Sequence, residues 1–355
     1  MEMYDKEHVA ELRKHNLLVF TEPNQVRIEF VRGCNLNCSF CGRSQASTGR
    51  ITKETLLNIV DNLTEKTKRI SISLQGEPTL HKNVGEYIGI IREKMPKAQI
   101  LIITNTEVYK SKNIFEFIDL FDKGLNYAQT DFYSKAQRDF FIGELERNKR
   151  ILEIKGIQVY DYYKDNVNAF SYKGYKHKTI ILTDESDIFN CDGNVTRRMH
   201  NWGGNLKLSQ WEKYTGSKLQ DFPLRKVCKE PYKYMTIGYD GIVDICCSNG
   251  AKCIDLGNVN EEHVLDIWQG EKFQKVRALL AEGYREDLIS CVLCSQRSFR
   301  VGLYPYWGKE YFYGDCIHTV EKIQKLHPKE PLYNNLIEFS KIGKLKPHIS
   351  KLIKE

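Results

Sequence analysis

The stretch that decides the fold is Cys34-Asn-Leu-Asn-Cys38-Ser-Phe-Cys41, which places three thiols within eight residues. It follows the run VRIEFV at residues 26–31, whose apolar and β-branched residues are typical of a β-strand. Three thiolates from one loop can hold three irons of a [4Fe–4S] cluster and leave the fourth iron without a protein ligand. Zinc is the alternative, but it needs a fourth nearby Cys or His, and none lies between Cys41 and His81. The loop therefore predicts an iron–sulfur cluster with one open coordination position.

Strand-like and helix-like runs alternate on the carboxyl side of this loop, as expected for βα units. Strands are expected at residues 26–31, 70–74 and 98–104, and helices at 52–60, 83–95 and 113–122. From residue 127 to 205 the alternation weakens, and two further strands are expected near 157–163 and 179–183. This α/β pattern favours a partial (β/α) TIM-like barrel or a doubly wound sheet.

The composition narrows the class of protein. The 355 residues carry a net charge of +7 and are 41% apolar, which suits a folded chain with one or two cores. No run approaches the roughly 18 apolar residues of a membrane span, and the first residues lack the apolar segment of a secretory signal. The lysines of the C-terminal region are interspersed with acids, unlike a nucleic-acid-binding arm. A cytoplasmic protein without a membrane or nucleic-acid partner is expected.

A second group of cysteines lies in the C-terminal half. Cys228, Cys246, Cys291 and Cys294 have the form Cys-x17-Cys-x44-Cys-x2-Cys, and four thiolates complete a cluster that has no open iron. The adjacent Cys247 could replace Cys246 as a ligand. A zinc ribbon with four cysteines is the alternative.

Two elements are expected around this second group. Residues 234–246 resemble a hairpin with its turn at Asp240-Gly241, and residues 264–280 read as a helix. The expected domains are an N-terminal extension (1–25), the barrel (26–205), the auxiliary cluster domain (206–300) and a basic, mainly helical C-terminal extension (301–355).

The first cysteine loop resembles the signature loop of the radical S-adenosylmethionine (SAM) superfamily. In that family the open iron chelates SAM, and an electron from the cluster cleaves SAM to a 5′-deoxyadenosyl radical. Gln75-Gly76-Glu77-Pro78 corresponds to the family's Gly-Gly-Glu-Pro motif, which receives the methionine amino group, although Gln75 departs from the first glycine. The resemblance further implies that Thr104-Asn105 contacts the ribose and that Phe40 flanks the adenine.

The second cysteine group resembles the SPASM domain or its shortened form, the twitch domain. A full SPASM domain would have further cysteines where this chain has Arg300 and Tyr304, so one auxiliary cluster is expected. The ligand spacing is most similar to the type that oxidises 2-deoxy-scyllo-inosamine. The resemblance covers most of residues 26–297.

The resemblance implies hydrogen abstraction from a small hydroxylated substrate, such as a sugar, a cyclitol or a nucleotide-linked sugar. Oxidation of a secondary alcohol to a ketone would use the auxiliary cluster as electron acceptor, with His200 or Arg198 near the reacting hydroxyl. Trp202 stands where the similar dehydrogenase type has an arginine. A radical epimerase is the main alternative, with Cys191 as the candidate hydrogen donor.

Two more alternatives remain: an enzyme that modifies a peptide, and an electron-transfer or metal-sensing protein that does not cleave SAM. The expected cofactors are SAM, a SAM-binding [4Fe–4S] cluster and an auxiliary [4Fe–4S] cluster. A flavodoxin- or ferredoxin-type reductase is the expected electron donor.

Overall fold

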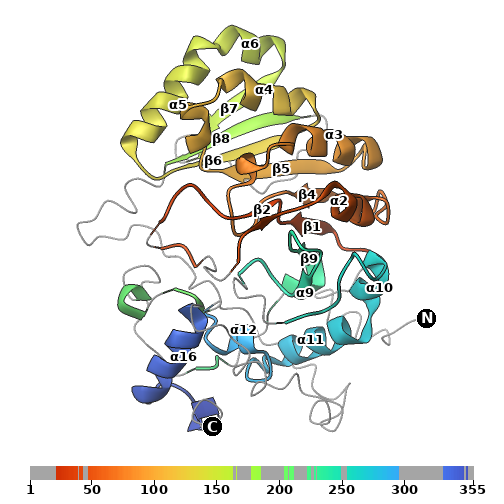
Figure 1. The fold of residues 1–355 in the computed structure, drawn as a ribbon, viewed down its shortest axis with the longest axis vertical. Coiled ribbons are helices and arrows are strands. Elements are labelled where there is room, and N and C mark those ends of the chain that lie inside the picture. Colours follow the sequence, from red (N-terminus) through yellow and green to blue (C-terminus); the bar gives the residue numbers. More distant parts are fainter. Residues whose placement is uncertain are drawn as a thin grey trace.

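An eight-stranded sheet forms the centre of the computed structural model (Figure 1). The structure describes residues 21–38, 40–42, 47–162, 165, 177–184, 204–206, 208–211, 222–224, 228, 230–248, 254–295, 331–347 and 349–350. The strand order is β10-β9-β1-β4-β5-β6-β8-β7, and every neighbouring pair is parallel except β9 with β10. The expected mostly parallel α/β sheet of a partial TIM-like barrel is confirmed.

The strands of this sheet are β1 (Gln25–Ile28), β4 (Arg69–Ser71), β5 (Gln99–Thr104), β6 (Tyr127–Phe132), β7 (Ile157–Asp161), β8 (Lys178–Asp184), β9 (Tyr234–Ile237) and β10 (Val243–Asp244). A separate pair, β2 (Val31–Arg32) and β3 (Gly49–Arg50), flanks the first cysteine loop. Parallel strands align their carboxyl ends along one edge of a sheet, so the segments that follow β4, β5 and β6 emerge together.

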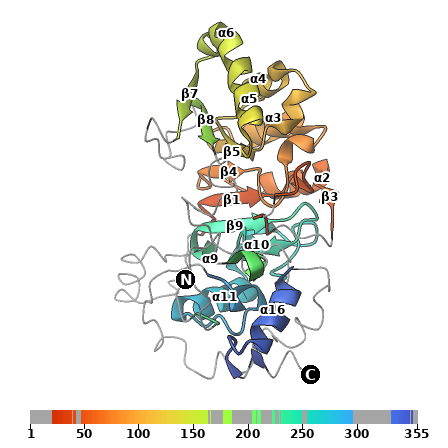
Figure 2. The same cartoon turned by 90° about the vertical axis from the view of Figure 1, so that its left-hand side faces the viewer.

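Helices cover one face of the sheet (Figure 2). They are α2 (Lys53–Val60), α3 (Val84–Lys94), α4 (Ile114–Asp122), α5 (Lys135–Arg147) and α6 (Lys149–Ile154). The Thr52 side chain caps α2 by accepting from the Thr55 amide, as expected of a helix N-cap. The apolar face of α4 includes Phe117 and Phe121, which are buried in the main hydrophobic core.

The second cysteine region contains α9 (Glu230–Lys233), α10 (Val264–Gln269), α11 (Glu271–Glu282) and α12 (Ile289–Val292), and α16 (Pro331–Lys341) packs beside it. Its hairpin, β9 and β10, does not form a separate sheet. Instead β9 pairs in parallel with β1, so the hairpin extends the main sheet. The short 3₁₀ segments are η1 (Pro78–Leu80), η2 (Glu107–Lys110) and η4 (Leu208–Gln210).

Two expectations from the sequence need correction. The single helix expected at residues 264–280 is two helices, because Gly270 adopts an extended conformation (φ −65°, ψ 161°) that ends α10 and begins α11. The sequence analysis also missed β6, α5 and α6. In α5 the buried residues are only Gln137, Phe141 and Leu145, so its apolar periodicity is weak.

No helix in the described part of the chain is long and apolar enough to cross a membrane. Most of the N-terminal extension (1–25) and much of the C-terminal extension (301–355) lie outside the described residues.

Candidate active site

The first cysteine loop leaves β2 and presents all three thiols to solvent to some degree. Cys34 and Cys38 are half-buried and Cys41 is exposed. The Cys41 amide donates to the Cys38 carbonyl (3.1 Å), which closes a turn between these two residues. The Leu36 amide lies 3.4 Å from the Cys34 sulfur and points its hydrogen at it. Such a contact favours a thiolate, the form of cysteine that binds iron.

Gly76 sits against the backbone that leads into this loop. A Cβ at this position would lie 2.1 Å from the Val31 carbonyl oxygen and 2.5 Å from that of Gly33. Both neighbours are main-chain atoms, so they cannot rotate away as a side chain could. The position accepts only glycine, because the Gln75-Gly76-Glu77 segment approaches this main chain closely.

The Glu77 carboxylate joins the ends of β4 and β5. Its Oε1 accepts from Thr79 N (3.0 Å), Thr79 Oγ1 (2.6 Å) and Thr104 Oγ1 (2.8 Å), and its Oε2 accepts from Asn105 N (2.8 Å). Its own amide donates to the Gly33 carbonyl (2.8 Å). Burial raises the pKa of Glu77, while the donors from Thr79, Thr104 and Asn105 act in the opposite direction. Three of the four donors contact Oε1 and one contacts Oε2, so Oε2 has the greater remaining capacity to accept from a ligand ammonium.

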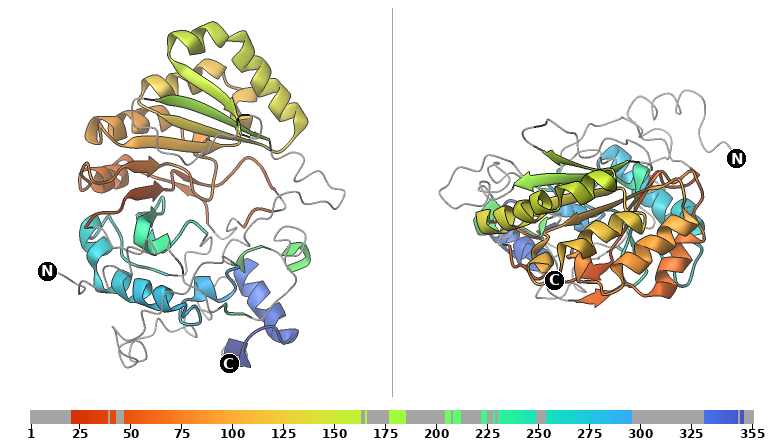
Figure 3. Two further views of the ribbon diagram at one scale, coloured as in Figure 1. Left: turned by 180° about the vertical axis from the view of Figure 1, so that it is seen from behind. Right: turned by 90° about the horizontal axis from the view of Figure 1, so that it is seen from above.

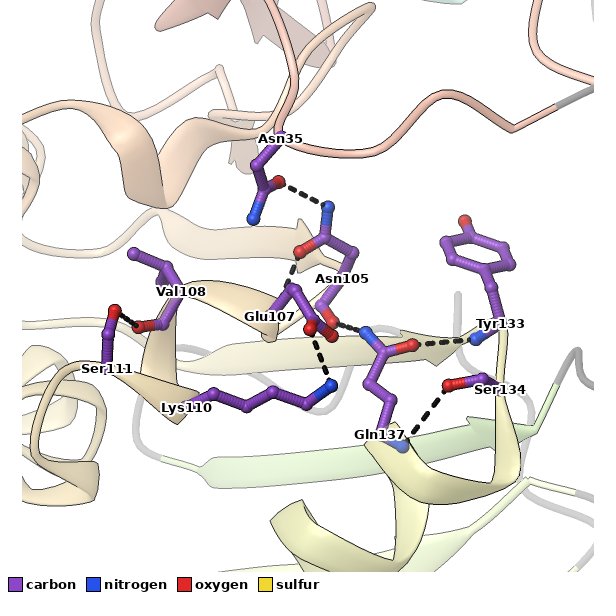
Figure 4. Close-up of polar contacts among 9 residues, drawn as sticks. All are labelled: Asn35, Asn105, Glu107, Val108, Lys110, Ser111, Tyr133, Ser134 and Gln137. Carbon is purple, nitrogen blue, oxygen red and sulfur yellow. Dashed lines mark hydrogen bonds and ion pairs between the residues drawn. The ribbon is translucent and has the colours of Figure 1, made fainter.

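Asn105 connects the same point to the cysteine loop (Figure 4). Its Nδ2 donates to Asn35 Oδ1 (2.9 Å) and lies 3.4 Å from Cys34 Sγ. Its carbonyl accepts from the Gln137 side chain, whose Oε1 accepts from the Tyr133 amide (2.9 Å). The sequence predicted Asn105 as a site residue, and the structure places it next to Asn35 and Gln137. The sequence analysis did not single out these two neighbours.

Phe40 and Tyr133 form an aromatic contact between the cysteine loop and the end of β6. Their ring centroids are 5.3 Å apart, and Phe40 is almost fully buried. The candidate adenine-flanking residue therefore has an aromatic neighbour that the sequence analysis did not single out.

The four cysteines of the second group lie near one another. Cys246 has Cys228 and Cys291 among its electrostatic neighbours, and Cys291 has Cys228 and Cys294. Burial raises the pKa of the Cys228 thiol to about 12 and raises those of Cys246 and Cys291 well above their usual value. Buried thiols with raised pKa values bind iron as thiolates only when the metal supplies the compensating charge, and four such donors suit a closed cluster. In the described residues, no three His, Cys, Asp or Glu side chains are grouped closely enough to hold one metal ion.

Cys247 has Arg27 and Glu230 as its main electrostatic neighbours. Its sulfur accepts from Arg27 Nη1 (3.1 Å), and the same nitrogen donates to Glu230 (2.7 Å). Its carbonyl accepts from the side-chain amide of Gln75, the residue that departs from the radical SAM motif. The two adjacent cysteines therefore differ in their other neighbours, and the Gln75 contact links the segment after β4 directly to the second cysteine region.

Arg285 is a cation beside the second cysteine group that the sequence analysis missed. It is only 1% exposed, its Nη1 donates to the Cys294 carbonyl (3.1 Å), and it lies near the thiols of Cys228 and Cys291. A buried positive charge in this place offsets negative charge on thiolate ligands.

The candidate catalytic residues His200, Arg198 and Cys191 lie outside the described residues, so their roles stay predictions. The same is true of Trp202.

We expect Gly76→Ala to abolish SAM binding, because the added methyl group must displace main-chain atoms at the entrance to the cysteine loop. Gly89→Ala is the matched control. A Cβ at Gly89, inside α3, meets no atom within 4 Å, and alanine should stabilise the helix by about 0.5–1 kcal/mol. Equilibrium binding of SAM to the reconstituted proteins, together with thermal unfolding, provides the measurement. Undiminished SAM binding by Gly76→Ala would contradict the assignment.

We expect Arg285→Met to make the midpoint potential of the second cluster more negative, by roughly tens of millivolts, because a nearby cation stabilises the reduced cluster. Redox titration followed by electron paramagnetic resonance gives the potential. Arg285→Lys keeps the charge and should retain most of the wild-type value. An unchanged potential in Arg285→Met would show that this cation has no electrostatic role.

Two protein-family models match the parts of the chain that contain the two cysteine groups. A model of the radical SAM superfamily matches residues 28–184, and a model of the SPASM iron–sulfur cluster-binding domain matches residues 228–295. A curated relative from Niallia circulans, named S-adenosyl-L-methionine-dependent 2-deoxy-scyllo-inosamine dehydrogenase, is 24% identical over 281 residues, which are 78% of this chain and 94% of the relative.

Two solved structures share the fold. The structure of BtrN in complex with AdoMet and 2-DOIA has a TM-score of 0.55 and 22% identity, and covers 78% of this chain and 94% of its own. A selenomethionine structure of BtrN in an open conformation has a TM-score of 0.51 and 19% identity over the same shares. The family models and the two cysteine groups identify SAM and two [4Fe–4S] clusters as the cofactors. The chain is therefore a radical SAM enzyme that carries a SPASM domain.

Proposed function

We propose that this enzyme oxidises a secondary alcohol of a small polyhydroxylated substrate to a ketone. The observation that carries this proposal is the similarity to the 2-deoxy-scyllo-inosamine dehydrogenase, which extends over 281 residues, 78% of this chain and 94% of that relative. A likeness confined to the first group would support SAM cleavage alone. In this proposal, the cluster held by the second cysteine group accepts the electron that the substrate loses.

We assign the SAM-binding cluster to Cys34, Cys38 and Cys41, and the auxiliary cluster to Cys228, Cys246, Cys291 and Cys294. The positions of the second set support this assignment, because Cys246 lies near Cys228 and Cys291 whereas Cys247 contacts Arg27. When bound, the first cluster and SAM supply a 5′-deoxyadenosyl radical that abstracts hydrogen, and the auxiliary cluster supplies an electron acceptor.

The protein's own residues prepare the site for this chemistry. Gly76 permits close approach of the backbone, and Glu77 fixes the ends of β4 and β5 relative to each other. Asn105 and Phe40 hold the cysteine loop against β5 and the end of β6. We assign the methionine amino group to the Gly76-Glu77 segment, the ribose to Thr104 and Asn105, and the adenine to the side of Phe40.

The substrate loses one hydrogen atom, one proton and one electron when a secondary alcohol becomes a ketone. The hydrogen atom leaves from the carbinol carbon and the proton from its hydroxyl. We assign the role of proton acceptor to His200, because an imidazole suits that role at neutral pH. We place Arg198 beside the reacting hydroxyl. A flavodoxin- or ferredoxin-type reductase would supply the electron that initiates each turnover. Epimerisation, with Cys191 as hydrogen donor, is the rival outcome.

The proposed oxidation predicts transfer of deuterium from the substrate carbinol carbon to 5′-deoxyadenosine. The probe is 2-deoxy-scyllo-inosamine deuterated at its carbinol carbons, incubated with the reduced, reconstituted enzyme and SAM. Mass spectrometry should detect labelled 5′-deoxyadenosine and a ketone in equal amounts. Recovery of an inverted alcohol that has gained hydrogen from solvent would instead indicate epimerisation, and Cys191→Ala would then test the donor.

The ligand assignment predicts different effects at two adjacent positions. Cys246→Ser should lower the iron content by about four of roughly eight atoms per chain and abolish ketone formation, while SAM cleavage persists. Cys247→Ser should retain all the iron, because its sulfur accepts from Arg27 and its main charged neighbours are Arg27 and Glu230. Iron analysis and absorption spectra of the reconstituted proteins provide the measurement. Loss of iron in Cys247→Ser, with retention in Cys246→Ser, would reverse the assignment.

A further inference from the structure

The hairpin of β9 and β10 forms one side of the second cysteine region. It lies between β1 and the helices α11 and α12, which the left-hand view of Figure 3 shows from behind. Met235 and Ile237 of β9 belong to the main hydrophobic core. Because successive residues of a strand point to opposite faces, Thr236, which stands between them in the sequence, faces the other way. We call the face that carries Thr236 the polar face of the hairpin.

The polar face of the hairpin is directed toward the second cysteine region. Thr236 pairs in register with Arg27 on β1 and with Asp244 on β10, and registered residues of neighbouring strands place their side chains on the same face. Arg27 donates from Nη1 to the Cys247 sulfur (3.1 Å). Asp244 is a charged neighbour of Cys246. Thr236 therefore lies between two side chains that both approach these cysteines.

The Thr236 hydroxyl is buried without a hydrogen bond. The residue is 1% exposed, and its Oγ1 has no partner within the described part of the chain. A buried hydroxyl that makes no hydrogen bond lowers the stability of the protein, and a valine would fill the same volume without that cost. A group that accepts from the hydroxyl would remove the cost, so this position indicates an acceptor that the protein chain does not itself provide.

Ser290 carries a second hydroxyl of the same kind on α12. It is 3% exposed, and its Oγ likewise has no partner in the residues that the structure describes. Ile289 and Val292 of this helix belong to the main core. The Cys294 amide donates to the Cys291 carbonyl (3.1 Å), so the turn continues to Cys294. At about 100° per helical residue, Ser290 lies on the side of the turn that carries the two cysteines.

We propose that Thr236 and Ser290 donate hydrogen bonds to sulfur atoms of the auxiliary cluster and thereby raise its reduction potential. Reduction adds negative charge to a cluster, so a donor at its sulfurs stabilises the reduced form more than the oxidised form. A cluster held by the four thiolates would present acceptor sulfurs to the strand β9 and to the helix α12, where the two hydroxyls lie without partners.

This inference rests on the assignment of the second cysteine group to the auxiliary cluster, and it deepens the proposed function. A higher reduction potential makes the auxiliary cluster a better acceptor for the electron that the substrate loses. Thr236 and Ser290 act through the cluster rather than on the substrate, so they are positioning residues for electron transfer. Their effect is therefore measured on the cluster itself, without any substrate.

The first test measures the potential after each hydroxyl is removed. Thr236→Val should shift the oxidation equilibrium of the auxiliary cluster by about tenfold, which is about 59 mV toward more negative potential for a one-electron couple. Ser290→Ala should shift it in the same direction. Redox titration of the full-length holoenzyme, followed by electron paramagnetic resonance, gives both cluster potentials. The SAM-binding cluster, whose signal changes when SAM is added, should keep its potential.

The second test detects the hydrogen bonds themselves. Electron–nuclear double resonance of the reduced auxiliary cluster, recorded in H2O and in D2O, reports the exchangeable protons close to its sulfurs. Each of the two variants should lose one such proton coupling. Thr236→Ser keeps the hydroxyl and should restore both the coupling and the potential. A merely structural role of Thr236 would not follow the hydroxyl in this way.

Thr183→Val is the matched control. Thr183 is also a strand residue, is 2% exposed, and has a hydroxyl without a partner among the residues described. It lies on β8, and the strands β1, β4, β5 and β6 stand between β8 and β9 in the sheet. The same substitution at this distant position should leave the potential of the auxiliary cluster and its exchangeable proton couplings unchanged.

Iron analysis first confirms that each variant holds about eight iron atoms per chain. If Thr236→Val loses iron, Ser290→Ala decides the test. Unchanged potentials and couplings in the loaded variants, or an equal shift in Thr183→Val, would overturn the inference. The proposed function fails separately. If the potentials shift as expected but the wild type forms no ketone, the oxidation is wrong and the inference stands. If ketone forms while the potentials do not respond, the oxidation stands and the inference is wrong.

Discussion

Pairing of β1 on both of its edges is the interaction on which the rest of the structure depends. β1 pairs in parallel with β4 on one side and with β9 on the other, so one strand joins the barrel to the hairpin of the SPASM domain. The segment after β4 carries Gln75, Gly76 and Glu77, and the segment after β10 carries Cys246 and Cys247. Both segments are thereby fixed relative to the same central strand. The Gln75 contact with the Cys247 carbonyl is a consequence of this arrangement.

This shared sheet has a chemical consequence for the proposed oxidation, which would use two redox centres. In that reaction the substrate would meet the hydrogen-abstracting group and lose an electron within one enzyme, so the two cluster sites would need a fixed separation. Parallel β pairing provides that rigidity through main-chain hydrogen bonds, which depend little on side-chain identity. Local polar contacts then refine the two ends: Glu77 and Asn105 at the SAM motif, and Arg285 at the second cysteine group.

The sequence predicted elements well where a local rule governed them. Thr52 caps α2, and the turn at Asp240-Gly241 uses Gly241 at a positive φ of 83°, as the hairpin reading requires. Prediction failed where tertiary contacts override local preference. The α5 segment has few apolar residues and is positioned by Phe141 and Leu145 against the core, and the helix expected at residues 264–280 divides at Gly270. A glycine within a periodic pattern does not reveal by itself whether the helix continues.

The sequence by itself determined the chemistry, because cysteine spacing and the Gln75-Gly76-Glu77-Pro78 segment limit which cofactors the chain can hold. Only the tertiary structure decided which neighbours those residues have. It placed the Cys247 sulfur against Arg27, and it placed Arg285 near thiols that are distant in sequence. The physical reason is that ligand identity is encoded locally by residue type and spacing. Proximity between β6 and β8, or between Cys228 and Cys291 on α12, instead arises from pairing and burial across long separations in the chain.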